Sequence, residues 1–259
     1  MKTNINKKNY YSIAILICLL LIFSSIGSFF NRFVSDNVSY IIELSAKIIF
    51  FFVMLFYIKK YELTKPEFKR LELFTLLFIP FLLLSGSNIF AELINKSEIN
   101  NNINYELLIK ALSISFITVI NEEIVFRGCL LKEIEKSEDR FRTIFVSALI
   151  FGLVHLLNIN SLGSIPYVLL QVGYSFYLGL ILGLMYLSTR NIIIPIIMHM
   201  SFNMVNSDLT NALFDIDYNV LYFVVNISIG VIIFIYFLIC YTIFKEKEKW
   251  DDVRKDLDF

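Results

Sequence analysis

The chain has 259 residues, of which 57% are hydrophobic, and its mean hydropathy is +0.70. An ordinary soluble domain is roughly 45–50% apolar, so the composition excludes that class and indicates a protein that spans a membrane several times. Lys and Arg balance Asp and Glu at 23 each. This net charge of zero argues against a nucleic-acid partner. The three cysteines have no metal-type spacing and indicate buried small hydrophobes with no disulfide framework.

In chain order, eight apolar runs approach the roughly 20 residues that a helix needs to cross a bilayer. The runs are Tyr11–Phe30, Val38–Ile58, Leu73–Phe90, Leu107–Leu131, Thr143–Leu157, Ile165–Leu187, Ile192–Val205 and Tyr218–Phe244. In lipid each run must be helical, because a lone strand would leave its backbone groups unpaired. The sequence therefore predicts an all-α membrane bundle of about eight transmembrane helices, forming a single integral membrane domain over residues 1–259.

Lys and Arg residues alternate between the connections of these runs. They are frequent at positions 2–8, 59–70, 132–142 and 245–255, whereas the fifth and seventh connections have none. The positive-inside rule then predicts a multi-pass protein of the cell membrane, with both termini and the even-numbered connections in the cytoplasm. The Ile-, Asn-, Lys- and Phe-rich composition is compatible with an AT-rich bacterial genome.

The fourth run carries Glu122, Glu123 and Arg127, and charged side chains are expensive in lipid. Arg127 follows Glu123 by four residues and shares its helix face. Glu122, in contrast, lies about 140° away from Arg127 around the helix axis. The spacing predicts a Glu123–Arg127 ion pair and leaves Glu122 as a free carboxylate that can act as a general base. A purely structural role for all three residues is the alternative, but it leaves Glu122 unexplained.

The two histidines, His155 and His199, lie in the fifth and seventh runs, and Asn203 shares a helix face with His199. Each alone is typical of an ordinary hydrogen-bonding residue between helices. Measured along the helix from the nearest basic connection, Glu122 lies ~15 Å deep, His155 ~20 Å and His199 ~14 Å. Three separate runs thus place ionisable side chains in one layer near mid-membrane, which predicts a shared site.

Other polar and small residues in the runs indicate packing. Glu43 and Lys47 are spaced to neutralise each other on one helix face. Gly179 and Gly183 form a Gly-x-x-x-Gly pattern that favours close helix packing. Pro195 predicts a kink that loosens the seventh run.

Three motifs in the central runs resemble those of the CAAX-protease and bacteriocin-processing family (CPBP, Abi), which is related to the type II CAAX prenyl endopeptidases. The motifs are Glu122-Glu123-x-x-x-Arg127, Phe151-x-x-x-His155 and His199-x-x-x-Asn203. The resemblance covers about residues 107–205, which would be the catalytic core. It implies an intramembrane endopeptidase with a core of transmembrane helices.

Carried over residue by residue, the resemblance implies distinct roles. Glu122 with His155 would position and activate the hydrolytic water. His199 and Asn203 would donate hydrogen bonds to the oxyanion of the tetrahedral intermediate. Arg127 would support the site by holding the second glutamate of the motif.

The resemblance leaves the metal requirement open. Family members are often called metalloproteases, and Glu122, His155 and His199 form a zinc-type ligand set. However, the sequence has no His-Glu-x-x-His helix, and a zinc-bound Glu122 would no longer be the base. We expect a glutamate-activated water with no required metal, and a zinc-dependent protease is the alternative.

Two other function classes compete with the protease. One is a non-enzymatic membrane immunity or adaptor protein that binds a peptide or partner. The other is a secondary transporter or proton pathway, although the chain has neither paired halves nor matched broken helices. For the protease, we expect a membrane-embedded or membrane-associated substrate, such as a bacteriocin or pheromone precursor, a lipopeptide or a membrane-protein segment.

Overall fold

The structure, a computed structural model, describes residues 7–61, 72–159, 162–216 and 219–257. Its principal helices are α1 (Lys7–Phe30), α2 (Asp36–Lys60), α3 (Glu72–Ser85), α4 (Ser87–Asn95), α5 (Tyr105–Glu123), α7 (Arg140–Leu153), α8 (Ile165–Thr189), α9 (Ile193–Asn203) and α11 (Val220–Leu257). Two single-turn helices, α6 (Lys132–Glu135) and α10 (Thr210–Leu213), join them. Within the described ranges the only β-structure is an isolated bridge between Ile99 and Phe214. The predicted all-α class is confirmed.

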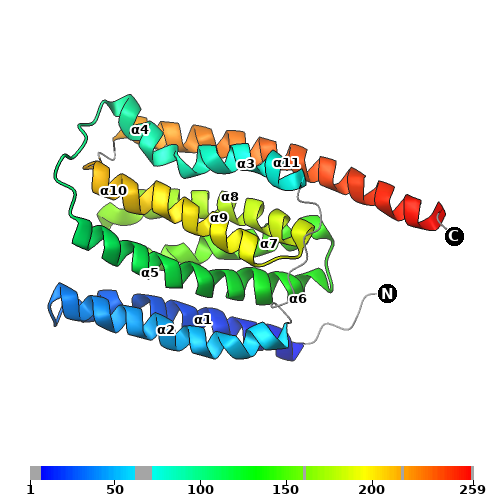
Figure 1. Ribbon diagram of the computed structural model, residues 1–259, viewed down its shortest axis with the longest axis horizontal. Helices are drawn as coiled ribbons and strands as arrows, with labels where there is room; N and C mark the ends of the chain where they lie inside the picture. Colours follow the sequence, from blue (N-terminus) through cyan, green and yellow to red (C-terminus); the bar gives the residue numbers. More distant parts are fainter. Residues whose placement is uncertain (1–6, 62–71, 160–161, 217–218, 258–259) are drawn as a thin grey trace.

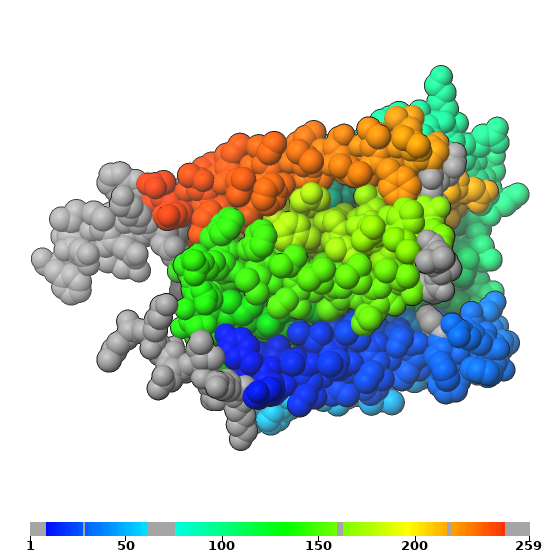
Figure 2. All heavy atoms as spheres, turned by 180° about the vertical axis from the view of Figure 1, so that it is seen from behind, coloured from blue at the N-terminus to red at the C-terminus, as the bar shows by residue number. Residues whose placement is uncertain are grey.

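The helices lie in three tiers (Figure 1). The middle tier holds the motif-bearing helices α5, α7 and α9 together with α8. It is covered on one side by α1 and α2, and on the other by α3, α4 and α11; between the tiers, α2 packs against α5 and α11 packs against α8. Figure 2 shows the same order from behind as three bands, with α11 above, α7 and α8 between, and α1 below. The motif-bearing helices are therefore enclosed by helices from both ends of the chain.

Five helical segments in the described part of the chain are long and apolar enough to cross a membrane. They are Asn9–Gly27, Asp36–Lys60, Arg140–Asn158, Ile165–Thr189 and Val220–Glu246. A sixth is possible because α3 and α4, predicted as one span, form a pair bent by 47°. The chain is thus a multi-pass membrane protein. Large apolar side chains are exposed along these helices, among them Phe52, Phe56 and Ile235, as expected for surfaces in lipid.

Two expected spans, 107–131 and 192–205, are not among these five or six. The first contains Lys110, Glu122, Glu123 and Arg127, which lower its hydropathy. The second forms only 11 residues of α-helix before its winding changes. In the first stretch, Glu122, Glu123 and Arg127 are motif residues, so the motif itself weakens the signal of a membrane span.

Polar contacts nevertheless show that both stretches run the length of the bundle. At one end, called here the basic end, segments rich in Lys and Arg meet through the pairs Asn9–Glu133, Lys132–Tyr61, Arg190–Glu135 and Arg140–Phe244. At the opposite end, Lys110 donates to Asn37, and the backbone N–H of Asn100 donates to the carbonyl of Leu213 at 2.7 Å. The chain therefore crosses from the opposite end to the basic end between 110 and 132, and returns between 190 and 213.

Small residues allow α7 and α8 to approach closely. A Cβ atom added at Gly179 would lie 2.9 Å from both Cα and Cβ of Ala148, and one at Gly183 would lie 3.3 Å from the Ile144 side chain. The close packing predicted for the Gly-x-x-x-Gly pattern is confirmed. The predicted kink at Pro195 is wrong. Pro195 lies in the first turn of α9, where a missing backbone N–H disturbs no helical hydrogen bond.

Candidate active site

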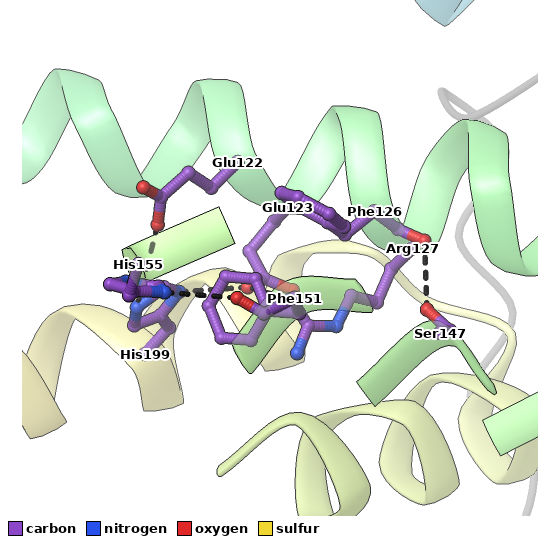
Figure 3. Close-up of polar contacts among 8 residues, drawn as sticks. All are labelled: Glu122, Glu123, Phe126, Arg127, Ser147, Phe151, His155 and His199. Carbon is purple, nitrogen blue, oxygen red and sulfur yellow. Dashed lines mark hydrogen bonds and ion pairs between the residues drawn. The ribbon is translucent and has the colours of Figure 1, made fainter. Parts of the chain in front are cut away.

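Glu122 and Glu123 lie at the end of α5, where the helix changes its winding. The chain continues into a π-helix, η1 (Ile124–Leu131), and π-helical turns are rare and occur frequently at functional sites. The two side chains leave the helix in different directions (Figure 3). The Glu123 side chain is fully buried, whereas that of Glu122 is 16% exposed. Two adjacent carboxylates thus occupy different environments.

Glu123 and Arg127 form the ion pair that the spacing predicted. Arg127 Nη1 donates to Glu123 Oε1 at 2.8 Å, and both side chains are buried. The guanidinium carbon also lies 4.4 Å from the centre of the Phe151 ring, a cation–π geometry. The same ring is in edge contact with His155 and His199, at centroid distances of 5.4 and 5.6 Å. Phe151 therefore connects the buried ion pair to both histidines (Figure 3).

His199, on α9, faces both glutamates. Its Nδ1 lies 2.8 Å from Glu123 Oε1, and its Nε2 lies 3.8 Å from Glu122 Oε2. A carboxylate can only accept, so Nδ1 donates to ionised Glu123 and the bond fixes the orientation of the ring. The sequence reasoning gave Glu123 a single partner, Arg127. The structure corrects this, because Glu123 holds the arginine and the histidine at once.

His155 lies just beyond α7, in a short 3-10 helix, η2 (Val154–Asn158). Its Nδ1 is 2.9 Å from the carbonyl oxygen of Phe151. Since a carbonyl only accepts, Nδ1 carries the proton of this bond, and Nε2 of the neutral ring is an acceptor. An acceptor nitrogen is the form of imidazole that can take a proton from water.

A cavity of about 290 Å³ brings the motif residues together: Glu122, His155, His199 and Asn203 all line it. Asn203 is the last residue of α9, directly before a second π-helix, η4 (Met204–Leu209). Each of the three motifs therefore lies in, or directly before, a departure from regular α-helix. The arrangement places a carboxylate, two imidazoles and an amide around one space, where they can activate water and bind a developing negative charge.

The sequence reasoning did not place Lys47 at this site. The predicted pair with Glu43 exists, with Lys47 Nζ 3.3 Å from Glu43 Oε1, but Lys47 also lines the cavity. Asn121, the neighbour of Glu122, donates from Nδ2 to the backbone carbonyl of Lys47 at 3.0 Å. The signal in the sequence was a charge inside an apolar run. No spacing relation connects Lys47 to the motifs, because α2 meets α5 only through tertiary packing.

A metal ion held by the zinc-type set of Glu122, His155 and His199 would need these three side chains close together. The hydrogen bond from His199 Nδ1 to Glu123 does not count against a metal, because metal-bound imidazoles commonly donate their second ring N–H to a carboxylate. Within the described ranges, however, no three His, Cys, Asp or Glu side chains are grouped closely enough to hold a metal ion. We therefore derive no chemical step through a metal, and the metal requirement is tested by experiment below.

Fold and cavity together define a multi-pass membrane protein with a buried site of carboxylates and imidazoles. Residues 104–205 match the family model described as type II CAAX prenyl endopeptidase Rce1-like. The chain therefore carries a domain of this family, which is a family of intramembrane proteases. The matched residues run from the start of α5 into η4 and form the middle tier, less than half of the chain. No curated protein matches the chain.

Proposed function

We propose that the chain is an intramembrane endopeptidase that hydrolyses a peptide bond of a membrane-associated peptide or protein with a water activated by Glu122. The observation that carries the proposal is the shared cavity of Glu122, His155, His199 and Asn203, backed by the buried Glu123–Arg127 pair. Peptide hydrolysis needs a base for water and hydrogen-bond donors where negative charge develops. All of these groups line or support the one cavity.

In the proposed reaction, Glu122 takes a proton from water while the water oxygen attacks the scissile carbonyl. His155 orients the water through Nε2, because the Phe151 carbonyl engages its Nδ1. The new oxyanion accepts hydrogen bonds from His199 Nε2 and the Asn203 amide. Collapse of the intermediate breaks the C–N bond, and the proton held by Glu122 passes to the leaving amine.

The role of His199 as a donor depends on Glu123. With Nδ1 donating to Glu123, His199 donates from Nε2 only as an imidazolium. Ionised Glu122 and Glu123 then balance Arg127 and protonated His199, so that the four groups sum to zero charge. A buried neutral set avoids the penalty of an uncompensated charge in the membrane. Glu123 is thus a positioning residue for the oxyanion donor.

We also propose eight spans with both termini in the cytoplasm. Support comes from the grouping of the Lys- and Arg-rich segments at the basic end. The stretches 110–132 and 190–213 each run from one end of the bundle to the other. They support two further spans beyond the five or six that hydropathy identifies.

The decisive experiment compares peptides released by cells that carry wild-type protein or Glu122→Gln. The substitution keeps the shape of the side chain and removes the base, so we expect peptides present in the wild-type sample to fall by roughly 10²–10⁴-fold. Glu106→Gln, an exposed carboxylate on the same helix, is the matched control and leaves the peptides unchanged. Equal peptide profiles for wild type and Glu122→Gln would remove Glu122 from the chemistry and favour a binding or adaptor role.

Metal dependence is tested on the purified full-length protein with a peptide found in that comparison. We expect cleavage to survive exhaustive dialysis against a chelator, because the activation of water is assigned to Glu122. The measurement is the initial rate before chelation, after chelation and after adding back Zn²⁺. Loss of activity that only Zn²⁺ restores would contradict the proposal and support the zinc-dependent protease.

A further inference from the structure

Lys47 brings a positive charge into the catalytic cavity from outside the matched domain. The family match covers residues 104–205, whereas α1 and α2 precede it. Leu20, Leu21 and Ser24 of α1 line the cavity together with Lys47 of α2. Part of the space around the reacting groups is therefore formed by segments that carry none of the three motifs.

The structure fixes the level of Lys47 relative to the proposed base. Asn121 precedes Glu122 in the chain, and its Nδ2 donates to the Lys47 backbone carbonyl at 3.0 Å. Both residues are buried, so this bond holds α2 against α5 beside the site. Lys47 and Glu122 thus enter one cavity from two adjacent helices.

Glu43 pairs with Lys47 but does not occupy all the hydrogen-bond donors of the lysine. Lys47 Nζ lies 3.3 Å from Glu43 Oε1, and the Lys47 side chain is 6% exposed. Glu43 is held against α1, since a Cβ atom added at Gly27 would fall 2.2 Å from Glu43 Oε2. An ammonium has three donors, so the contact with Glu43 leaves Lys47 able to bind a second acceptor in the cavity.

A lysine in this position changes which ligands the cavity accepts. Among the residues that line it in the described structure, Lys47 is the only Lys or Arg, and Glu122 is the only Asp or Glu. The charge of Glu122 is already balanced by its neighbours Arg127 and protonated His199, so Lys47 adds a further cationic donor that an anionic ligand can meet. Hydrogen bonds between an ammonium and a carboxylate are among the strong ones, and they strengthen where water is excluded.

We propose that Lys47 binds a carboxylate of the substrate within the catalytic cavity. The carboxylate belongs either to the C-terminus of the peptide or to an acidic side chain near the cleaved bond. This inference rests on the proposed function for its setting, and it adds the substrate class: a peptide that presents a negative charge beside the base. It also gives α2 a function in substrate selection.

The test measures binding, so its outcome does not depend on whether the protein cleaves. Full-length protein in nanodiscs is equilibrated with tritiated N-acetyl-Ile-Phe as the free acid, with the same peptide as the C-terminal amide, and with N-acetyl-Asp-Phe-amide. We expect wild type to bind at least one of the two carboxylate peptides about tenfold more tightly than the uncharged amide. Preference for the free acid identifies a C-terminal carboxylate, and preference for the Asp peptide identifies an acidic side chain.

Three variants connect the preference to Lys47. Lys47→Met is expected to lose the tenfold preference while the affinity for the uncharged amide stays within twofold, which also shows that the cavity is intact. Lys47→Arg is expected to retain the preference. Lys110→Met is the matched control, because Lys110 also pairs with a glutamate four residues away but does not line the cavity. The proposal is overturned if wild type does not distinguish acid from amide, or if Lys47→Met keeps the preference.

Discussion

Glu123 is the residue on which the interior of the site depends. Its Oε1 accepts from Arg127 Nη1 and from His199 Nδ1, each at 2.8 Å, and its side chain is fully buried. Phe151 covers the guanidinium and contacts both imidazole rings. A buried ion pair adds little net stability, but removal of one partner leaves an uncompensated charge. The positions of His199 and Arg127 are therefore coupled through one carboxylate oxygen.

This coupling predicts a large loss of stability for Arg127→Met. The substitution leaves Glu123 buried without its cation, and we expect the free energy of unfolding to fall by about 3–5 kcal/mol. The measurement is thermal or denaturant unfolding of the purified protein in detergent. Adding Glu123→Gln to the same chain removes the unpaired charge and recovers part of the loss.

Arg142→Met provides the control for that experiment. Arg142 also pairs with a glutamate four residues away, Glu138, but its side chain is 70% exposed. Exposed ion pairs contribute roughly 0–1 kcal/mol. Similar losses for Arg127→Met and Arg142→Met would contradict the coupling described for Glu123.

At the scale of elements, the site is built where regular helices stop. α5 gives way to the π-helix η1 after Glu123, α7 to the 3-10 helix η2 before His155, and α9 to the π-helix η4 after Asn203. Carbonyls displaced by such changes need other partners. The Phe126 carbonyl in η1 accepts from Ser147 on α7, and the Phe151 carbonyl accepts from His155. The departures from α-helix are thus held by contacts from neighbouring helices and side chains.

The packing of α7 against α8 supports the segment that carries His155, just beyond α7. This packing depends on Gly179. A side chain there meets the backbone of α7, since even a Cβ atom falls 2.9 Å from Ala148 Cα. We expect Gly179→Leu to lower the free energy of unfolding by about 1–3 kcal/mol through overpacking. Gly173→Leu on the same helix is the control, because a Cβ atom at Gly173 has no neighbour within 4 Å. Equal unfolding transitions for the two variants would show that α7 and α8 tolerate separation.

At the scale of the whole molecule, three tiers enclose the site, and the two ends of the bundle differ in charge. The Lys- and Arg-rich segments meet at the basic end, and α1 begins there (Figure 1). The connection between α4 and α5 lies at the opposite end, where it bridges to the chain after α10. The proposed eight spans are an even number of membrane crossings, which brings the two termini to the same side of the membrane. An odd number would separate them.

Single cysteines test the proposed orientation. In a chain without native cysteines, Asn101→Cys and Glu138→Cys place exposed thiols at the opposite end and the basic end. We expect a membrane-impermeant maleimide to label Asn101→Cys in intact cells and Glu138→Cys only after permeabilisation, because the proposed orientation puts the basic end in the cytoplasm. Labelling of Glu138→Cys in intact cells, with Asn101→Cys protected, would invert the topology.

By itself the sequence determined the class, the motif residues and their local pairing. Long hydrophobic runs indicate helices surrounded by lipid, so the all-α class followed directly. A spacing of four residues indicates a shared helix face, so the Glu123–Arg127 pair followed as well. The same local rules predicted the Glu43–Lys47 pair and the close packing at Gly179.

Only the tertiary structure decided which side chains share the cavity and where the helices change their winding. The second partner of Glu123 is on another helix, Lys47 reaches the cavity through the packing of α2 on α5, and Pro195 falls in a first turn. Such relations depend on how separate helices are placed against one another. Residue spacing along one helix carries no information about that placement, because each helix satisfies its backbone hydrogen bonds within itself and leaves its orientation to the packing of side chains.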